Sequence, residues 1–160
     1  MLAGPNGSGK STLKSVLLPE LLGIYLNADE IEAAIIRTGC LQPADYGIST
    51  TTDEILPFFS SAQLLSDNGL KPESSRLAFA NGRLEFRDVA VNSYWASVAV
   101  DFLQRKLLGQ RAAFTLETVM SHSSKVEILQ AAQRAGYRTY LYFIATDDPE
   151  INRSRACVTG

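Results

Sequence analysis

The sequence predicts an α/β fold of three layers, with a mainly parallel sheet between helices and a small β-hairpin insertion. Short runs of apolar, branched and aromatic residues alternate with segments whose apolar residues recur every three or four positions. Strands separated by helices are joined by crossovers, and crossovers connect parallel strands. A length of 160 residues with 46% apolar content suits one core, so we expect residues 1–160 to form a single domain.

The first strand–helix pair lies at the start of the chain. Residues 1–3 are a short apolar run, and residues 10–18 have helical character up to Pro19. A typical strand has about five residues, so the first strand is expected to be clipped and the chain to be a fragment or a shortened relative of a longer protein.

The second pair is better delimited. Residues 24–26 are apolar and predict a strand. Asn27 then predicts a helix start, because Glu30 follows three residues later as in a capping box. Gly39 predicts the end of that helix.

The middle of the chain predicts a loop from residue 40, a helix over 55–65 and a hairpin within about 70–90. The hairpin rests on Asn81-Gly82, a pair that favours a two-residue turn between strands. The turn pairs the flanking residues so that one face carries four apolar side chains, those of Leu77, Phe79, Leu84 and Phe86.

Two helix–strand pairs follow the hairpin. Asn92 predicts the start of a helix that ends at Gly109 and carries Trp95 into the core, and residues 112–116 predict a buried strand. A capping box at Ser124 opens the next helix, which ends at Gly136.

The last segments predict a strand and a helix. Residues 137–144 are the clearest strand in the chain because they are rich in aromatic and branched residues, and their tyrosines are expected in the core. A helix is expected near 149–157.

The bulk composition excludes some classes of protein. A net charge of −2 gives no electrostatic reason to expect a nucleic-acid partner, because wrapping nucleic acid usually needs a strong basic patch, and it leaves room for a small basic pocket. The chain has no apolar run of ~18 residues and no leader, so we expect no membrane association and a cytoplasmic location. Cys40 and Cys157 match no metal-ligand spacing and are expected to be free thiols.

A phosphate-binding loop is the strongest signal. The pattern G-x-x-x-x-G-K-[ST] is met within residues 4–12, namely Gly4, Pro5, Asn6, Gly7, Ser8, Gly9, Lys10, Ser11 and Thr12. Glycines let successive N–H groups face one concavity around phosphates, and the following helix adds the positive end of its dipole. Lys10 is expected to reach the terminal phosphates of ATP, and the Ser11 hydroxyl to ligate Mg²⁺. The fold class is therefore that of a P-loop NTPase.

Two carboxylates are candidates for the acceptor side, because ligands of such sheets bind beyond the carboxyl ends of the strands. Asp29 is the candidate general base, and its alternative role is that of a first-turn acid that complements the helix dipole. Glu117 is the candidate for contacting substrate hydroxyls or for holding Mg²⁺ through water, and its alternative is an exposed carboxylate at a strand end.

Three other side chains have weaker signals. His122 is the only histidine and is interpreted as a polar edge residue rather than a catalytic group. Arg153 and Arg155 lie about where kinases carry a lid arginine that stabilises the transferred phosphoryl group, and a solvated helix face is the alternative.

Four segments together resemble the zeta toxin family of P-loop kinases. They occur in the order of the family and are G-P-N-G-S-G-K-S-T at 4–12, L-N-A-D-E-I at 26–31, F-T-L-E-T-V-M-S at 114–121 and D-P-E-I-N at 148–152. The first alone is shared with many ATPases, and the set is more specific. N-S-Y-W-A-S at 92–97 also resembles the bacterial branch with the hairpin insertion.

The resemblance implies an activity. The best-known members use ATP to phosphorylate the 3′-hydroxyl of the amino sugar in UDP-N-acetylglucosamine, and a small antitoxin blocks the nucleotide site. It implies that Lys10 and Ser11 serve ATP and Mg²⁺ and that Asp29 is the base.

For the acceptor and the lid, the resemblance implies that Glu117 and Thr118 contact the nucleotide sugar and that Arg155 is the first lid arginine. Members usually carry a second arginine and a Gly-Gly-His stretch further on, which this sequence lacks. Because a lid arginine is worth orders of magnitude in rate, nucleotide binding is expected to survive better than turnover.

Three hypotheses of function remain open on the sequence. The first is the sugar-nucleotide kinase. The second is a kinase for another hydroxylated acceptor, such as an antibiotic, a nucleotide or a polynucleotide end, the last disfavoured by the net charge of −2. The third is a catalytically weak nucleotide-binding module that acts through a protein partner.

Overall fold

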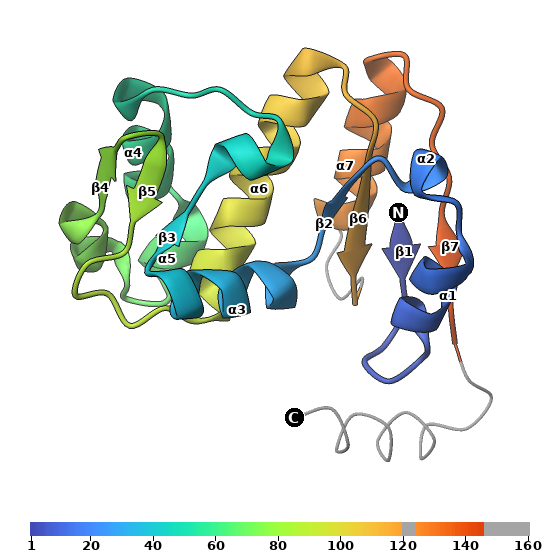
Figure 1. Cartoon of the computed structure of the whole chain (residues 1–160), viewed down its shortest axis with the longest axis horizontal. Coiled ribbons are helices and arrows are strands. Elements are labelled where there is room, and N and C mark those ends of the chain that lie inside the picture. The colour runs from blue at the N-terminus through green and yellow to red at the C-terminus, as the bar shows by residue number, and fades with distance from the viewer. Residues whose placement is uncertain (120–123, 146–160) are drawn as a thin grey trace. The chain divides into compact units, whose positions relative to one another are not determined.

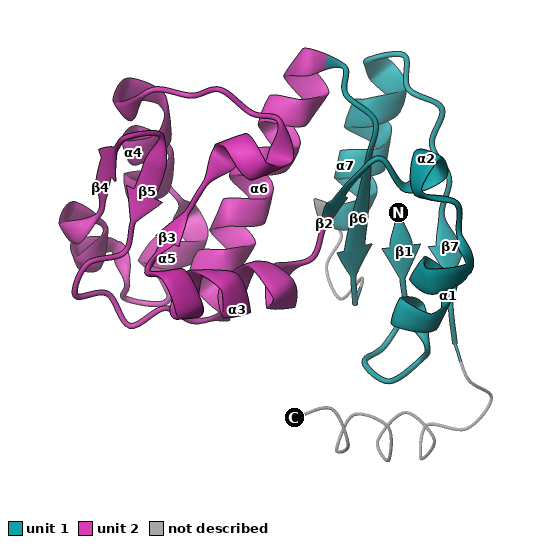
Figure 2. Ribbon diagram, viewed as in Figure 1, with its two compact units in different colours: residues 1–25, 111–160 teal, residues 26–110 magenta. Residues whose placement is uncertain are grey.

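The computed structural model describes residues 1–119 and 124–145 of the chain. The chain has a mixed α/β fold and divides into two compact units, the first of residues 1–25 and 111–160 and the second of residues 26–110 (Figures 1 and 2). Among the helices within the described residues, none combines the length and apolar character that crossing a bilayer requires.

A four-stranded parallel sheet has the strand order β2-β6-β1-β7, which confirms the predicted parallel sheet. Its strands are β1 (Leu2–Ala3), β2 (Ile24–Leu26), β6 (Phe114–Thr118) and β7 (Tyr142–Phe143). In the register of β1 with β6, Leu2 lies beside Glu117 and Ala3 beside Thr118. The end of β1 therefore lies beside the two polar residues that end β6.

In the described part of the first unit, the helices are α1 (Lys10–Val16), α2 (Pro19–Leu22) and α7 (Ser124–Arg134). The helix predicted over 10–18 ends at Val16, because the backbone of Leu17 is already extended (ψ 141°) and Pro19 occupies the start of the next helix.

The second unit has a small antiparallel sheet with the order β3-β5-β4. Its elements are α3 (Ala28–Thr38), β3 (Cys40–Leu41), a 3₁₀ turn (Pro43–Tyr46), α4 (Thr52–Ser60), α5 (Gln63–Asp67), a 3₁₀ turn (Lys71–Arg76), β4 (Ala78–Ala80), β5 (Arg83–Glu85) and α6 (Ser93–Gln110).

The predicted hairpin is present in this sheet. Phe79 lies opposite Leu84, and Asn81 (φ 52°) and Gly82 (φ 75°) form the turn, both in the left-handed region that asparagine and glycine tolerate. Leu84 is fully buried, and Leu77 and Phe86 are buried as well. Unlike the prediction, β3 adds a third strand to the hairpin.

Aromatic side chains form the core of the second unit. Trp95 and Phe59 are fully buried, and their rings stack at a centroid distance of 6.4 Å. Phe86 meets Trp95 edge to face at 6.0 Å. The predicted core position of Trp95 is confirmed.

The helix predicted over 55–65 is wrong in its continuity. The chain forms α4 and α5 instead, separated by Ala62, whose backbone is extended (φ −64°, ψ 117°). The last turn of α4 tightens before this break, since the N–H of Ala62 bonds to the carbonyl of Phe59.

The strand predicted over 137–144 is wrong in its length. Only Tyr142–Phe143 pair as β7, and at the start of the segment Tyr137 still closes α7 through a bond from its N–H to the carbonyl of Ala132. The expected burial of the tyrosines is also wrong for two of them: Tyr140 is 61% exposed and Tyr142 44% exposed. The helix predicted near 149–157 lies outside the described residues.

Candidate functional site

The glycine-rich loop leaves β1 at Gly4, which is held closely between two neighbouring strands. Its N–H donates to the carbonyl of Thr118 at 3.2 Å. Its φ is +146°, and a Cβ there would lie 2.1 Å from the carbonyl oxygen of Ile144. Only glycine fits at this position, because any side chain would displace the backbone after β7.

The loop turns at two further glycines. Gly7 and Gly9 have positive φ angles of 76° and 96°. Ser8 lies between them, and its N–H closes a turn onto the carbonyl of Pro5 at 3.2 Å. Successive residues whose φ angles alternate in sign form a concavity lined by backbone N–H groups, and such a concavity suits an anion.

Lys10 folds back over the loop that precedes it. Its side chain is almost fully buried, and Nζ donates to the carbonyl oxygens of Gly4 and Pro5, each at 2.9 Å. Nζ also lies 3.9 Å from Oε1 of Glu117. The ammonium group is therefore held between the start of the loop and the carboxylate of Glu117.

Glu117 comes to the loop from β6. Its side chain is 12% exposed, and its two oxygens face different partners. Oε1 faces Lys10, and Oε2 accepts a hydrogen bond from the hydroxyl of Tyr25. The side chain of Lys14 covers the ring of Tyr25, with Nζ 3.6 Å from the centroid. Glu117 is therefore not an ordinary exposed carboxylate at a strand end.

Tyr25 was not predicted from the sequence as part of the site. The available signal was a phenol hydroxyl inside the apolar run Ile24–Leu26, since a partly buried hydroxyl needs a hydrogen-bond partner. Nothing in the local pattern identifies that partner, because Glu117 is 92 residues away along the chain.

Several hydroxyl groups of the loop are available to bind a ligand. Ser8 Oγ is buried and has no hydrogen-bond partner within the described residues. The side chains of Ser11 and Thr12 are exposed at the start of α1. A buried hydroxyl without a partner, an ammonium group and an exposed hydroxyl on one loop fit a triphosphate with its divalent cation.

The remaining predicted site residues lie in the second unit or outside the described residues. Asp29 belongs to the second unit, where it is exposed in the first turn of α3. Asn27 caps that turn as predicted, since its Oδ1 accepts from the N–H groups of Asp29 at 2.8 Å and Glu30 at 3.2 Å. Arg155, Arg153 and His122 lie outside the described residues.

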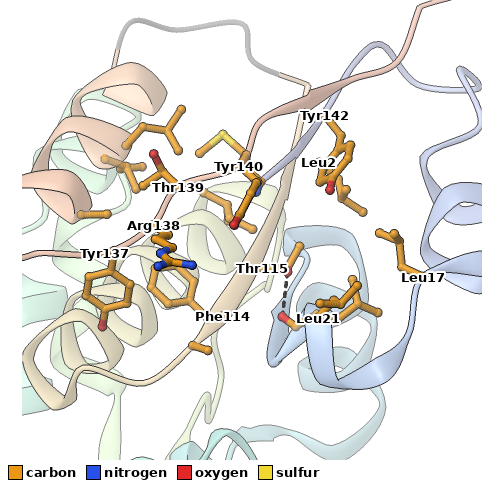
Figure 3. A pocket seen from close by; sticks show the side chains of 17 residues that line it. Leu2, Leu17, Leu21, Phe114, Thr115, Tyr137, Arg138, Thr139, Tyr140 and Tyr142 are labelled. Atoms are coloured by element: carbon orange, nitrogen blue, oxygen red, sulfur yellow. Dashed lines mark hydrogen bonds between the residues drawn. The ribbon is translucent and has the colours of Figure 1, made fainter.

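A cavity of about 410 Å³ in the first unit is distinct from the loop. Figure 3 shows apolar and aromatic side chains around it, among them Leu21, Phe114 and Tyr140. Its lining includes the beginning of β6 but neither Glu117 nor any residue of 4–12. The cavity is therefore not the place where the loop would hold phosphates.

Within the described ranges, no three His, Cys, Asp or Glu side chains gather as a metal site. Comparison of the chain with protein-family models, with curated proteins and with solved structures finds no match.

Proposed function

We propose that this chain is an ATP-dependent kinase of the zeta toxin type, with the three-layer fold of the P-loop NTPases. It transfers the γ-phosphoryl group of ATP to a sugar hydroxyl, that of UDP-N-acetylglucosamine. As an enzyme that consumes ATP and a nucleotide sugar, it acts in the cytoplasm, where an antitoxin protein is its proposed partner.

The observation that carries the proposal is the position of Lys10 between its own loop and Glu117. Nζ lies 2.9 Å from the carbonyl oxygens of Gly4 and Pro5 and 3.9 Å from Oε1 of Glu117. In this proposal, the ammonium group of Lys10 binds phosphate beside the carboxylate of Glu117 on the neighbouring strand. Lys10 and Glu117 thus lie together at the carboxyl ends of two parallel strands. This arrangement supports a phosphoryl-transfer site, because such transfer depends on positioning the reactants and stabilising charge.

The residues of the loop have distinct roles in this proposal. The backbone N–H groups from Asn6 to Thr12 line the phosphates, with Gly4 and Pro5 forming the entry to the loop. Lys10 exchanges its carbonyl partners for β- and γ-phosphate oxygens. Ser11 would hold Mg²⁺ through its exposed hydroxyl. When bound, the cation neutralises charge on the phosphates.

The acceptor side has its own residues. Asp29 accepts the proton of the attacking hydroxyl, and Thr118 contacts the substrate from the strand next to the loop. Glu117, on the same strand, would either contact the substrate or hold Mg²⁺ through water. Arg155 stabilises the charge of the transferred group.

Direct incubation tests the proposal. The protein is mixed with ATP, Mg²⁺ and UDP-N-acetylglucosamine, and mass spectrometry searches for a phosphorylated sugar nucleotide. Formation of that product, lost in Lys10→Met, supports the proposal. Phosphorylation of a different hydroxyl compound, and not of UDP-N-acetylglucosamine, would support the kinase activity and reject the proposed acceptor. Tight ATP binding without transfer to any acceptor would favour a nucleotide-binding module that acts through a partner.

The role of Asp29 has a matched control in Asp53. Both are exposed acids in the first turn of a helix, Asp29 in α3 and Asp53 in α4. Asp29→Asn and Asp53→Asn therefore weaken the helix-dipole interaction equally. We expect Asp29→Asn alone to abolish transfer while ATP binding is kept. Equal turnover of the two variants would remove Asp29 as the base.

A further inference from the structure

Tyr25 lies between Lys14 of α1 and Glu117, and Lys10 of the same helix faces that carboxylate directly. Lys10 and Lys14 are four residues apart, so they project from the same side of α1. Nζ of Lys14 lies over the ring of Tyr25, 3.6 Å from its centroid, and Nζ of Lys10 lies 3.9 Å from Oε1 of Glu117. The hydroxyl of Tyr25 donates to Oε2 of the same carboxylate. One tyrosine thus lies between a cation at its ring and an anion at its hydroxyl.

This arrangement restricts the carboxylate. A glutamate carboxylate with only one oxygen held can still rotate about χ3, because the preferred range of that torsion is broad. Here the hydroxyl holds Oε2, and Oε1 is thereby turned toward Lys10. Lys14 restrains the ring that carries the hydroxyl, because an ammonium group over an aromatic face is attracted to it.

The direction in which Oε1 faces distinguishes the two roles considered for Glu117. Oε1 faces the ammonium group of the loop rather than away from it, on the side where the triphosphate would lie. Ser11 follows Lys10 directly and is exposed. A carboxylate so placed would lie on the side of the hydration shell of a divalent cation bound with the phosphates, since Mg²⁺ usually keeps several waters in such sites.

We propose that Tyr25 is a positioning residue that orients Glu117 toward the water shell of the Mg²⁺ bound with the nucleotide. The inference rests on the proposed function and deepens it by assigning Glu117 to the metal rather than to the acceptor. Tyr25 itself touches neither the metal nor the nucleotide. Its effect passes through Glu117 and concerns the Mg²⁺-dependent part of nucleotide affinity.

Nucleotide titration of the full chain tests this inference. Affinity for a fluorescent ATP analogue is measured with Mg²⁺ and with EDTA, and the ratio of the two dissociation constants is the Mg²⁺ gain. Tyr25→Phe keeps the ring beneath Lys14 and removes only the hydroxyl. Tyr140→Phe is the control, because Tyr140 is 61% exposed and lines the separate cavity. Circular dichroism verifies that all variants are folded.

The expected result is a Mg²⁺ gain about tenfold smaller in Tyr25→Phe, with unchanged affinity in EDTA, as the loss of a hydrogen bond to a charged group implies. Glu117→Gln lowers the gain at least as much, and adding Tyr25→Phe to it has no further effect. Tyr140→Phe behaves as the wild type.

Other outcomes overturn the inference in distinguishable ways. A Mg²⁺ gain in Tyr25→Phe equal to that of the wild type contradicts the role of Tyr25, even if binding of an acceptor changes. Additive effects in the double variant contradict an action through Glu117. Absence of nucleotide binding in the wild type itself rejects the proposed function, and the inference falls with it.

Discussion

Gly4 donates its backbone N–H to the carbonyl oxygen of Thr118 at 3.2 Å, which ties the first residue of the loop to the last residue of β6. The bond continues the parallel ladder in which Leu2 lies beside Glu117. Glu117 is therefore placed beside the loop by the backbone of the sheet and does not depend on a long side chain to reach it.

Gly4→Ala is expected to destabilise the first unit by about 2 kcal/mol or more, because backbone strain and a steric clash act together. A Cβ would lie 2.1 Å from the carbonyl oxygen of Ile144. Gly136→Ala is the matched control, since Gly136 also has a positive φ (85°) and open space around it. Urea unfolding followed by circular dichroism measures both. Equal losses of stability would contradict the close packing at Gly4.

Asn27→Ala is expected to cost the second unit about 1 kcal/mol through loss of the helix cap, and Asn27→Ser to restore most of it. Oδ1 of Asn27 accepts from two N–H groups of α3, and Ala offers no acceptor. Trp95 is the only tryptophan and lies in the core of the same unit, so its fluorescence reports this unfolding. A serine variant as unstable as the alanine variant would rule out the cap.

A pH-dependent contact is expected between α4 and α6. Hydrogen bonds from the side chains of Lys106 and Thr50 and from the backbone of Thr51 lower the pKa of Glu54 below its ordinary value. Because the pKa is lowered in the folded state, the contact contributes stability above the unfolded-state pKa and loses it as pH falls through the folded-state pKa.

Carbon-detected NMR titration measures this contact. Lys106→Met is expected to raise the pKa of Glu54 toward its ordinary value, whereas Lys71→Met, an exposed lysine of the same unit, is expected to leave it unchanged. The effect weakens with added salt because the side chain of Glu54 is exposed. A Glu54 titration that is identical in Lys106→Met and the wild type would contradict the pairing.

Features that depend on adjacent residues were predicted from the sequence. The helix start at Asn27 and the hairpin turn at Asn81 follow from the conformations and hydrogen bonds that asparagine favours, and both are present. The conformations of Gly7 and Gly9 follow in the same way, since a tight loop requires positive φ angles.

Features that depend on which strands are neighbours were not predicted. Tyr25 reaches Glu117 only because β2 lies next to β6 in the sheet, and the order of strands has no local signal. The two-residue strand β3 is recognisable only through its pairing with β5. Strand propensity predicted a longer β7, because an aromatic run has the same composition whether it pairs along its whole length or only at Tyr142–Phe143.

The most direct test of the account is calorimetric titration of the protein with MgATP, alongside Lys10→Met. Lys125→Met in α7 serves as a control for the loss of one positive charge in the same unit. We expect saturable binding by the wild type and by Lys125→Met, and binding weaker by about 10- to 100-fold in Lys10→Met, because the loop loses its charged donor to phosphate. Absence of binding by the wild type, or equal affinity in Lys10→Met, would contradict the account.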